Sequence, residues 1–224
     1  MRNWSPRRKA LGVTIAAQRE VNQTVKETLK TVARIVATLT ILPTLASYRL
    51  RARLMGPDRA LEGSTQMLSL IPGLPGQYLR RAFLARVLAE CHETAAIEFG
   101  TIFSSAGARI GERAYVGPRC HLGLAHIGAG ALLAAGVHVP SGARTHDISN
   151  VVLPIREQPG VRTVVRIGAG AWIGSAAVVM ADVGTHSVVG AGAVVTQAIP
   201  CGVVAAGVPA RIIRTRGGAV ERRA

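Results

Sequence analysis

Aromatic residues and cysteines are scarce in this 224-residue chain. Phe, Trp and Tyr together make up 4% of the residues, which favours an interior built from small aliphatic side chains. The three cysteines, Cys91, Cys120 and Cys201, are widely spaced and form neither a disulfide framework nor a Cys-x-x-Cys motif. We therefore expect a reducing compartment, the cytoplasm.

Acidic residues are also few, since 12 Asp and Glu stand against 27 Lys and Arg, for a net charge of +15. The excess lies at the ends, with +9 in residues 1–60 and +4 in residues 205–224, while residues 61–204 carry only +2. Basic ends suit nucleic acid, an anionic membrane surface or an anionic cofactor. Because no nucleic-acid motif accompanies them, and no aromatics alternate with the basic residues, we expect no nucleic-acid partner.

The apolar run near the N-terminus is too short to cross a bilayer, which takes about 20 residues. Residues 35–48 carry no charge but number only 14, and Pro43 breaks them. We do not expect a signal peptide, because about 34 residues precede this run and arginines follow it.

Residues 1–60 are predicted to form a basic amphipathic helical extension. One face of that helix is apolar, as the spacing of Val21, Val25, Leu29, Val32 and Val36 indicates. Two interpretations stay open. The segment either lies on the inner face of the plasma membrane or packs as a helical hairpin on the protein or a neighbouring subunit. Residues 61–96 are predicted to be a helical linker, whose helix at about 77–92 caps the next domain.

What is abundant is an aliphatic residue at every sixth position. The repeat is clearest at Ile167, Ile173 and Val179, and again at Val183, Val189 and Val195, with one shortened link between the two runs. Glycine follows most of these positions, and small residues return four places later. The same period recurs upstream, at Ile110, Val116, Leu122, Ile127, Leu133 and Val139, with the link after Leu122 one residue short. A short fixed period predicts a β-solenoid whose turns bury one another's apolar faces.

The most specific motifs are WIGS at 172–175, GAG at 190–192, VVT at 194–196 and AAGVPARIIR at 205–214. With them, residues 97–214 resemble the hexapeptide-repeat acyltransferases, which implies a left-handed parallel β-helix, although parallel crossovers are generally right-handed. The motifs resemble the sugar O-acetyltransferase branch (galactoside, maltose and capsular polysaccharide enzymes). IPGLPGQYLRRAF at 71–83 is similar to acetyltransferases of exopolysaccharide and colanic-acid type. Residues 215–224 are a basic tail.

His146, in SGARTHD at 141–147, stands where the repeat is interrupted by an excursion at 147–166. Loops on rigid frames commonly carry function, and a neutral imidazole is a suitable base for a hydroxyl proton. The resemblance implies that His146 is the catalytic base, although Asp147 replaces the proline that maltose-type enzymes have next. The alternative is a turn histidine bonded to backbone.

The resemblance also implies an acetyl-CoA site and an oxyanion donor. The backbone N–H of Ser175 would hold the oxyanion of the tetrahedral intermediate, and Trp172 would line the site or simply pack. Contacts to acetyl-CoA carry over to Ser175, Ala191, Thr196, Gln197, Arg211 and Arg214, with Gln197 standing where the family usually has lysine. We expect a sugar acceptor, a homotrimer with sites between subunits, and no metal.

Two other functions remain possible at this point. His121 and His126 have the spacing of the metal pair in γ-carbonic anhydrases, which are β-helices too, but no third histidine lies at the required interval. A non-catalytic scaffold would not need His146, WIGS and the GVPARIIR tail together. His121 and His138 each end a hexad one turn apart, so they should stack at one corner. We expect them to cover the surface, with an acceptor cleft as the alternative.

Overall fold

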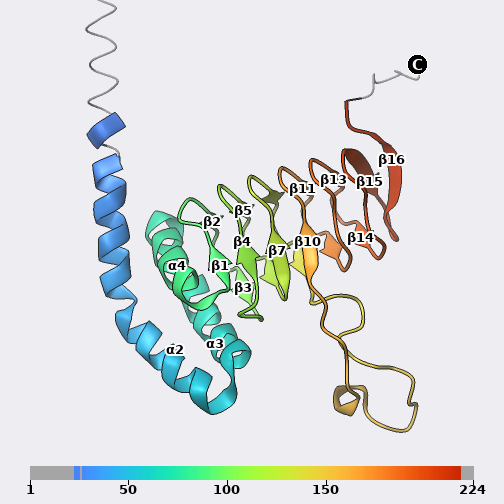
Figure 1. The fold of residues 1–224 in the computed structure, drawn as a ribbon, viewed down its shortest axis with the longest axis horizontal. Helices are drawn as coiled ribbons and strands as arrows, with labels where there is room; N and C mark the ends of the chain where they lie inside the picture. The colour runs from blue at the N-terminus through green and yellow to red at the C-terminus, as the bar shows by residue number, and fades with distance from the viewer. Residues whose placement is uncertain (1–22, 26, 218–224) are drawn as a thin grey trace, which may run out of the picture.

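The computed structural model describes residues 23–25 and 27–217, so Val21 of the apolar stripe lies outside the described residues. A block of helices stands at one end of an elongated solenoid (Figure 1). The helices are Gln23–Thr40, α2 (Leu42–Met55), α3 (Pro57–Ser69) and α4 (Gly73–Val87).

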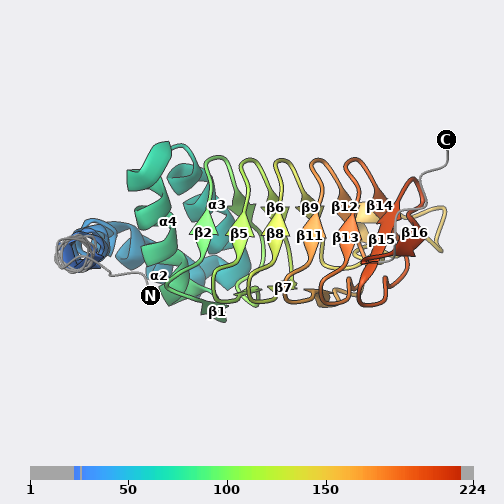
Figure 2. The same cartoon turned by 90° about the horizontal axis from the view of Figure 1, so that it is seen from above.

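The solenoid is the predicted left-handed parallel β-helix, with three sheets that each take one strand from successive turns (Figure 2). Sheet A contains β1 (Glu90–Cys91), β4 (Arg109–Ile110), β7 (Ala125–Ile127) and β10 (Val165–Ile167). Sheet B contains β2 (Ala96–Ile97), β5 (Tyr115–Val116), β8 (Leu132–Leu133), β11 (Trp172–Ile173), β13 (Val188–Val189), β15 (Val203–Ala206) and the antiparallel β16 (Arg211–Thr215). Sheet C contains β3 (Ile102–Phe103), β6 (His121–Leu122), β9 (His138–Val139), β12 (Val178–Val179) and β14 (Val194–Val195).

The six-residue repeat sets the register of these sheets. In sheet B, Ile97 pairs with Val116, then Leu133, Ile173 and Val189 follow on successive turns, all essentially closed to solvent. Each buried aliphatic side chain of this size contributes about 1.5–3 kcal/mol. The aliphatic positions read from the sequence are therefore the interior ladder of the solenoid.

Glycine after the aliphatic residue is required by the close stacking of turns. A Cβ on Gly174 would lie 2.4 Å from the backbone nitrogen of Ala191 in the next turn. The shortened link after Val179 has a structural counterpart as well. Val183 makes only isolated bridges, to Ile167 and Ile199, where the earlier turns have a strand of sheet A.

Helices α3 and α4 cover the first turn of the solenoid. The predicted helix at 77–92 begins earlier, at Gly73, because Pro72 and Pro75 are compatible with a helix N-terminus. It also ends earlier, since the N–H of Ala89 donates to the carbonyl of Ala106 (2.8 Å) and the chain enters β1. Helix α3 crosses residue 60, so the extension and the cap meet within one helix.

Buried polar groups join the cap to the turn beneath it. Arg80 of α4 is 2% exposed, and its guanidinium donates to the carbonyls of Ile97 (2.9 Å), Leu68 (3.2 Å) and Ile71 (2.7 Å). Burial lowers the pKa of Arg80, an effect that the nearby Glu98 opposes. These bonds fix the helical block to the solenoid.

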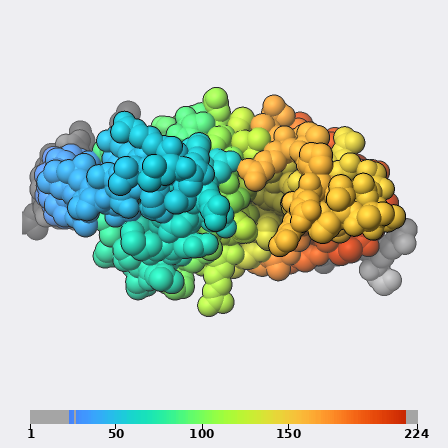
Figure 3. Space-filling model, turned by 90° about the horizontal axis from the view of Figure 1, so that it is seen from below, coloured from blue at the N-terminus to red at the C-terminus, as the bar shows by residue number. Residues whose placement is uncertain are grey.

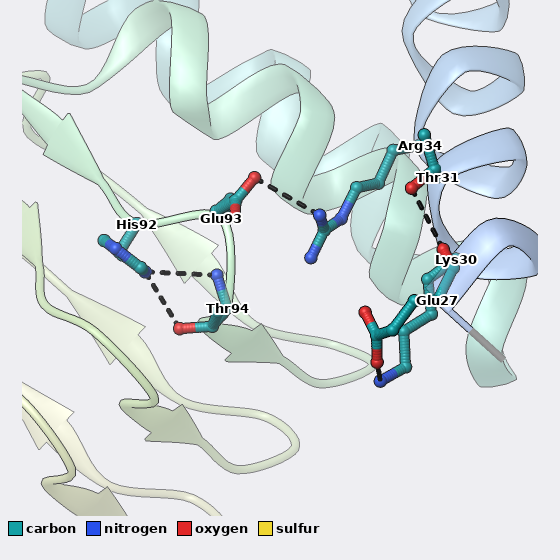
Figure 4. Close-up of polar contacts among 7 residues, drawn as sticks. All are labelled: Glu27, Lys30, Thr31, Arg34, His92, Glu93 and Thr94. Carbon is teal, nitrogen blue, oxygen red and sulfur yellow. Dashed lines mark hydrogen bonds and ion pairs between the residues drawn. The ribbon is translucent and has the colours of Figure 1, made fainter. Parts of the chain in front are cut away.

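The helix Gln23–Thr40 leaves its apolar face uncovered. Leu29, Val32 and Val36 are each more than half exposed. An ion pair between Arg34 and Glu93 (3.3 Å) ties this helix to the bend after β1 (Figure 4). No single helix among the described residues is long and apolar enough to span a membrane, but Gln23–Thr40 and Leu42–Met55, bent by 47°, meet the criterion together.

Candidate functional site

The solenoid is interrupted once, at the corner where sheet C turns into sheet A between β9 and β10. Residues 141–164 leave the prism there and project from it (Figure 1). Their two ends pair as a ribbon, which we call the stalk. The N–H of Thr163 donates to Ser141 O (2.9 Å), that of Val161 to Arg144 O (2.8 Å), and that of Asp147 to Pro159 O (3.1 Å).

Glycines allow the two sides of the stalk to approach closely. A Cβ on Gly160 would lie 1.9 Å from Thr145 O and 2.6 Å from His146 N. Gly142 has a φ of +87°, a conformation that side chains disfavour, and a Cβ there would meet the hydroxyl of Thr163. The backbone at His146 is thus held by the opposite side of the stalk.

Beyond the stalk, the excursion is held by polar bonds rather than by a core. Gln158, just after the short 3₁₀ helix Ile155–Glu157, is buried. Its side-chain amide donates to Asn150 O (2.7 Å) and Leu153 O (2.9 Å). Asp147 accepts bonds from the N–H and hydroxyl of Ser149, which lower the pKa of Asp147. The acidic residue after His146 therefore forms a local turn.

His146 lines a surface hollow of about 360 Å³, which we call the histidine hollow. Figure 3 shows the surface hollowed between the helices and the excursion. The outer face of sheet C, the corner after it and the stalk contribute the lining. These residues are Ser104, His121, Gly123, His138, Val139, Pro140, Ser141, Thr145, His146 and Arg162.

His121 and His138 stack in this hollow, as their register predicted. They are direct neighbours on β6 and β9, and their ring centroids are 4.8 Å apart at 49°. Partial burial lowers the pKa of His138, and the neighbouring His121 lowers it further. His138 is exposed, as expected for a surface position, and the hollow that both histidines line also contains His146.

Arg162 of the stalk forms the rim of the hollow toward the helices. It makes an ion pair with Asp58 of α3 (3.0 Å), and Asp58 also accepts a bond from Ala106 N (2.9 Å). A second hollow of about 560 Å³ continues from this rim, sharing Ser104 and Arg162 with the first. Arg162 and Asp58 were not predicted from the sequence, because 104 residues separate them and no local pattern links them.

The residues expected to bind acetyl-CoA lie toward the C-terminal end of the solenoid. Ser175 and Ala191 occupy the B–C corner of successive turns, where Gly192 N donates to Ser175 O (2.8 Å). Thr196 and Gln197 follow β14 at the C–A corner and are exposed.

An outward row on sheet B extends this region. Trp172 pairs with Val188, Val188 with Val204, and Val204 with Arg214 of β16, so the row runs from the indole to the arginine. Trp172 is 52% exposed, and the side chains of Arg211 and Arg214 are exposed as well. Guanidinium groups at such an edge suit phosphates.

The described chain does not bring His146 and Ser175 to one corner. His146 projects at the C–A corner and Ser175 lies at the B–C corner, at the other end of the sheet C strands. His121 and His126 are separated as well, since β6 belongs to sheet C and β7 to sheet A. Within one chain, His121 and His126 therefore lie on different sheets and do not form a metal pair. Residues 23–25 and 27–217 hold no group of three possible metal ligands.

Comparison with known proteins agrees with this architecture. The Escherichia coli (strain K12) galactoside O-acetyltransferase is 31% identical over 163 residues, which cover 63% of this chain and 80% of that protein. A solved galactoside acetyltransferase in complex with coenzyme A matches with a TM-score of 0.55 at 26% identity, over 76% of this chain and 82% of its own.

A maltose O-acetyltransferase from Clostridium difficile 630 shares the fold, with a TM-score of 0.57 at 21% identity over 71% of this chain and 88% of its own. No family profile matches the sequence. The identity to the Escherichia coli protein extends over most of that protein, and the solved galactoside enzyme has the same solenoid. The chain thus belongs to the hexapeptide-repeat sugar O-acetyltransferase family.

Proposed function

We propose that this protein transfers an acetyl group from acetyl-CoA to a sugar hydroxyl, with His146 as the general base. The observation that carries the proposal is the position of His146 in a polar hollow beside the solenoid, on a stalk that fixes its backbone. Membership of the sugar O-acetyltransferase family supports the reaction, and the coenzyme A complex of a solved relative supports the co-substrate.

The reaction follows from the chemistry of a thioester and an imidazole. His146 takes the proton of the acceptor hydroxyl while that oxygen attacks the thioester carbonyl. The resulting oxyanion is held by the backbone N–H of Ser175, whose side chain is not required. Collapse breaks the carbon–sulfur bond, and the thiolate of coenzyme A receives the proton from His146. The co-substrate is held by the residues of the C-terminal turns, namely Trp172, Ala191, Thr196, Gln197, Arg211 and Arg214.

We further propose that the active enzyme is a homotrimer with its sites between subunits. The support is geometric, since His146 and Ser175 lie at different corners of one prism and a neighbouring copy can bring them together. Mixing two inactive variants, His146→Ala and Arg211→Glu/Arg214→Glu, would restore activity at interfaces that combine the two intact halves. Failure of mixed, reassembled trimers to recover activity would place the site within one chain.

The acceptor in this proposal is a glycan or lipid-linked intermediate of surface-polysaccharide assembly at the inner face of the plasma membrane. The exposed apolar face of the helix Gln23–Thr40 and the basic N-terminal segment support it. Leu29→Glu/Val36→Glu should abolish flotation with anionic vesicles and leave turnover of a soluble acceptor intact. Unchanged flotation of the variant would contradict the membrane proposal.

The deciding experiment measures thiol release from acetyl-CoA with a panel of mono- and oligosaccharides. Wild type should turn over at least one acceptor, and His146→Ala should lose about 10²–10⁴-fold in kcat. Because His146 is exposed, the variant should keep the melting temperature of wild type. Persistent turnover in the variant would show that another residue is the base. If wild type neither turns over an acceptor nor binds acetyl-CoA, a non-catalytic scaffold is favoured.

A further inference from the structure

The stacked imidazoles of His121 and His138 are not used by the reaction described above. They project from the outer face of sheet C into the histidine hollow, and His146 lines the same hollow from the stalk. Two turns of a rigid solenoid hold the pair, because Leu122 and Val139, the next residues of the same strands, are fully buried. The pair is thus fixed relative to the proposed base.

One ring nitrogen of the pair is buried without a partner. His121 Nε2 is closed to solvent, and it has no hydrogen-bond partner among the described residues. Buried polar nitrogens are normally satisfied, so an unsatisfied one in the wall of a hollow indicates a missing partner. A ligand in the hollow can supply that partner.

The surroundings of the pair favour a neutral ligand. Partial burial and the neighbouring ring lower the pKa of His138, so the uncharged imidazole is favoured. A neutral imidazole has one donor nitrogen and one acceptor nitrogen, which match the donor and acceptor of a hydroxyl. The guanidinium at the rim, Arg162, is already paired with Asp58, which leaves no unbalanced charge in the lining.

We propose that His121 and His138 form the acceptor subsite, where their ring nitrogens bind a second hydroxyl of a neutral, polyhydroxylated acceptor and orient its reacting hydroxyl toward His146. This inference rests on the proposed function and assigns its substrate class. The two residues are positioning residues: they bind the acceptor, while His146 carries out the proton transfer. The subsite selects sugars with a hydroxyl neighbouring the one that is acetylated.

Steady-state kinetics with methyl β-galactoside and maltose as acceptors test the subsite. His121→Asn and His138→Asn should each raise the acceptor KM about tenfold, the effect of one lost hydrogen bond, and change kcat and the acetyl-CoA KM less than twofold. His92→Asn is the matched control, since His92 lies at the bend after β1, bonded to Thr94 (Figure 4). It is not among the residues that line the hollow. The control variant should match wild type.

Monodeoxy galactosides make the test specific for the bond. Removal of the hydroxyl bound by the pair should cost wild type about tenfold in kcat/KM and should cost His138→Asn nothing further. Two results would overturn the subsite and leave the proposed function standing. One is a tenfold loss of kcat/KM with the deoxy sugar in both histidine variants, as in wild type, and the other is an unchanged acceptor KM in these variants. Absence of turnover by wild type with every acceptor of the saccharide panel would overturn both. If His121→Asn fails to fold, the more exposed His138→Asn decides.

Discussion

The turns of the solenoid and the excursion at 141–164 are built on opposite principles. In the turns from β2 to β15, the inward residue of each strand is closed to solvent, and the backbone pairs with the turns on either side. In the excursion, Val151 and Val152 are 95% and 87% exposed, and the buried Gln158 organises the chain through its side-chain amide. His146 lies at the junction of the two regions.

This contrast separates stability from chemistry. The turns supply a stable frame. A substitution in one turn disturbs the packing of the adjacent turns, as expected of a stacked repeat. The excursion adds little buried apolar surface and is therefore free to differ in sequence and shape, while its stalk keeps one side chain in place. Substitutions in the turns should therefore change stability, and substitutions in the excursion should change activity or local opening.

Loss of a core ring should destabilise the turns far more than a comparable change in the excursion. Phe103 of β3 is fully buried, and Phe103→Ala should lower the free energy of unfolding by about 3–5 kcal/mol. Val152→Ala should change it by less than about 0.5 kcal/mol. Denaturant unfolding at one fixed protein concentration checks both. Equal losses would show that the excursion is part of the core.

A methyl group added at a glycine should lower activity in the stalk and lower stability in the turns. Gly160→Ala would force the stalk apart at Thr145 and His146, and a displacement of about 1 Å should lower kcat/KM about 100-fold. Gly168→Ala would place its Cβ 2.4 Å from Thr185 N within the turns and should chiefly lower the melting temperature. A Gly160→Ala enzyme with wild-type kinetics would show that the stalk does not position the base.

Removal of the Gln158 amide should loosen the excursion alone. Gln158→Ala leaves the carbonyls of Asn150 and Leu153 without their donor, which should favour local opening by about 1–3 kcal/mol. Trypsin cleavage after Arg156, whose side chain is 85% exposed, should then accelerate at least tenfold with little change in global melting. Val151→Ala is the control. Unchanged cleavage would mean that the stalk alone holds the excursion.

Alkaline pH should weaken the turns through their thiols. Burial raises the pKa of Cys91 to about 12 and that of Cys120 to about 11, while the unfolded thiols ionise near 9. Stability present below pH 9 is therefore lost as pH rises toward these values, by about 1 kcal/mol per thiol at pH 9.5–10. Cys120→Ala should flatten the decline between pH 8 and 10, and the exposed Cys201→Ser should not.

Much of the solenoid could be predicted, because its repeat is a local pattern. Ile173 and Val189 are spaced so that each returns to the same sheet after one turn, which predicts both inward direction and register. The stacking of His121 on His138 followed from the same count. The helix predicted at 77–92 lies at Gly73–Val87. It ends early because the N–H of Ala89 bonds to the carbonyl of Ala106 in the solenoid, a tertiary contact that the local pattern does not contain.

The candidate site was predictable only in its parts. His146 was proposed from its place at the interruption of the repeat, and the residues expected to bind acetyl-CoA were proposed from their motifs. The hollow was not predicted, because it arises where the stalk, sheet C and the start of α3 meet, far apart in sequence. The presence of His146 in the same hollow as His121 and His138 was not predicted, for the same reason.

The aliphatic repeat was enough to predict the β-solenoid and its inward ladder, because a side chain's direction in a repeat depends only on its count along the chain. The excursion was predicted at 147–166 and lies at 141–164, since the stalk begins with pairing between its own two ends. Tertiary structure decided which exposed side chains share a site. The folding of residues 141–164 beside sheet C brings His146 to His121 and His138, and the bond between Arg162 and Asp58 closes the rim. Contacts of this kind depend on the path of a non-repeating segment, which no periodic pattern encodes.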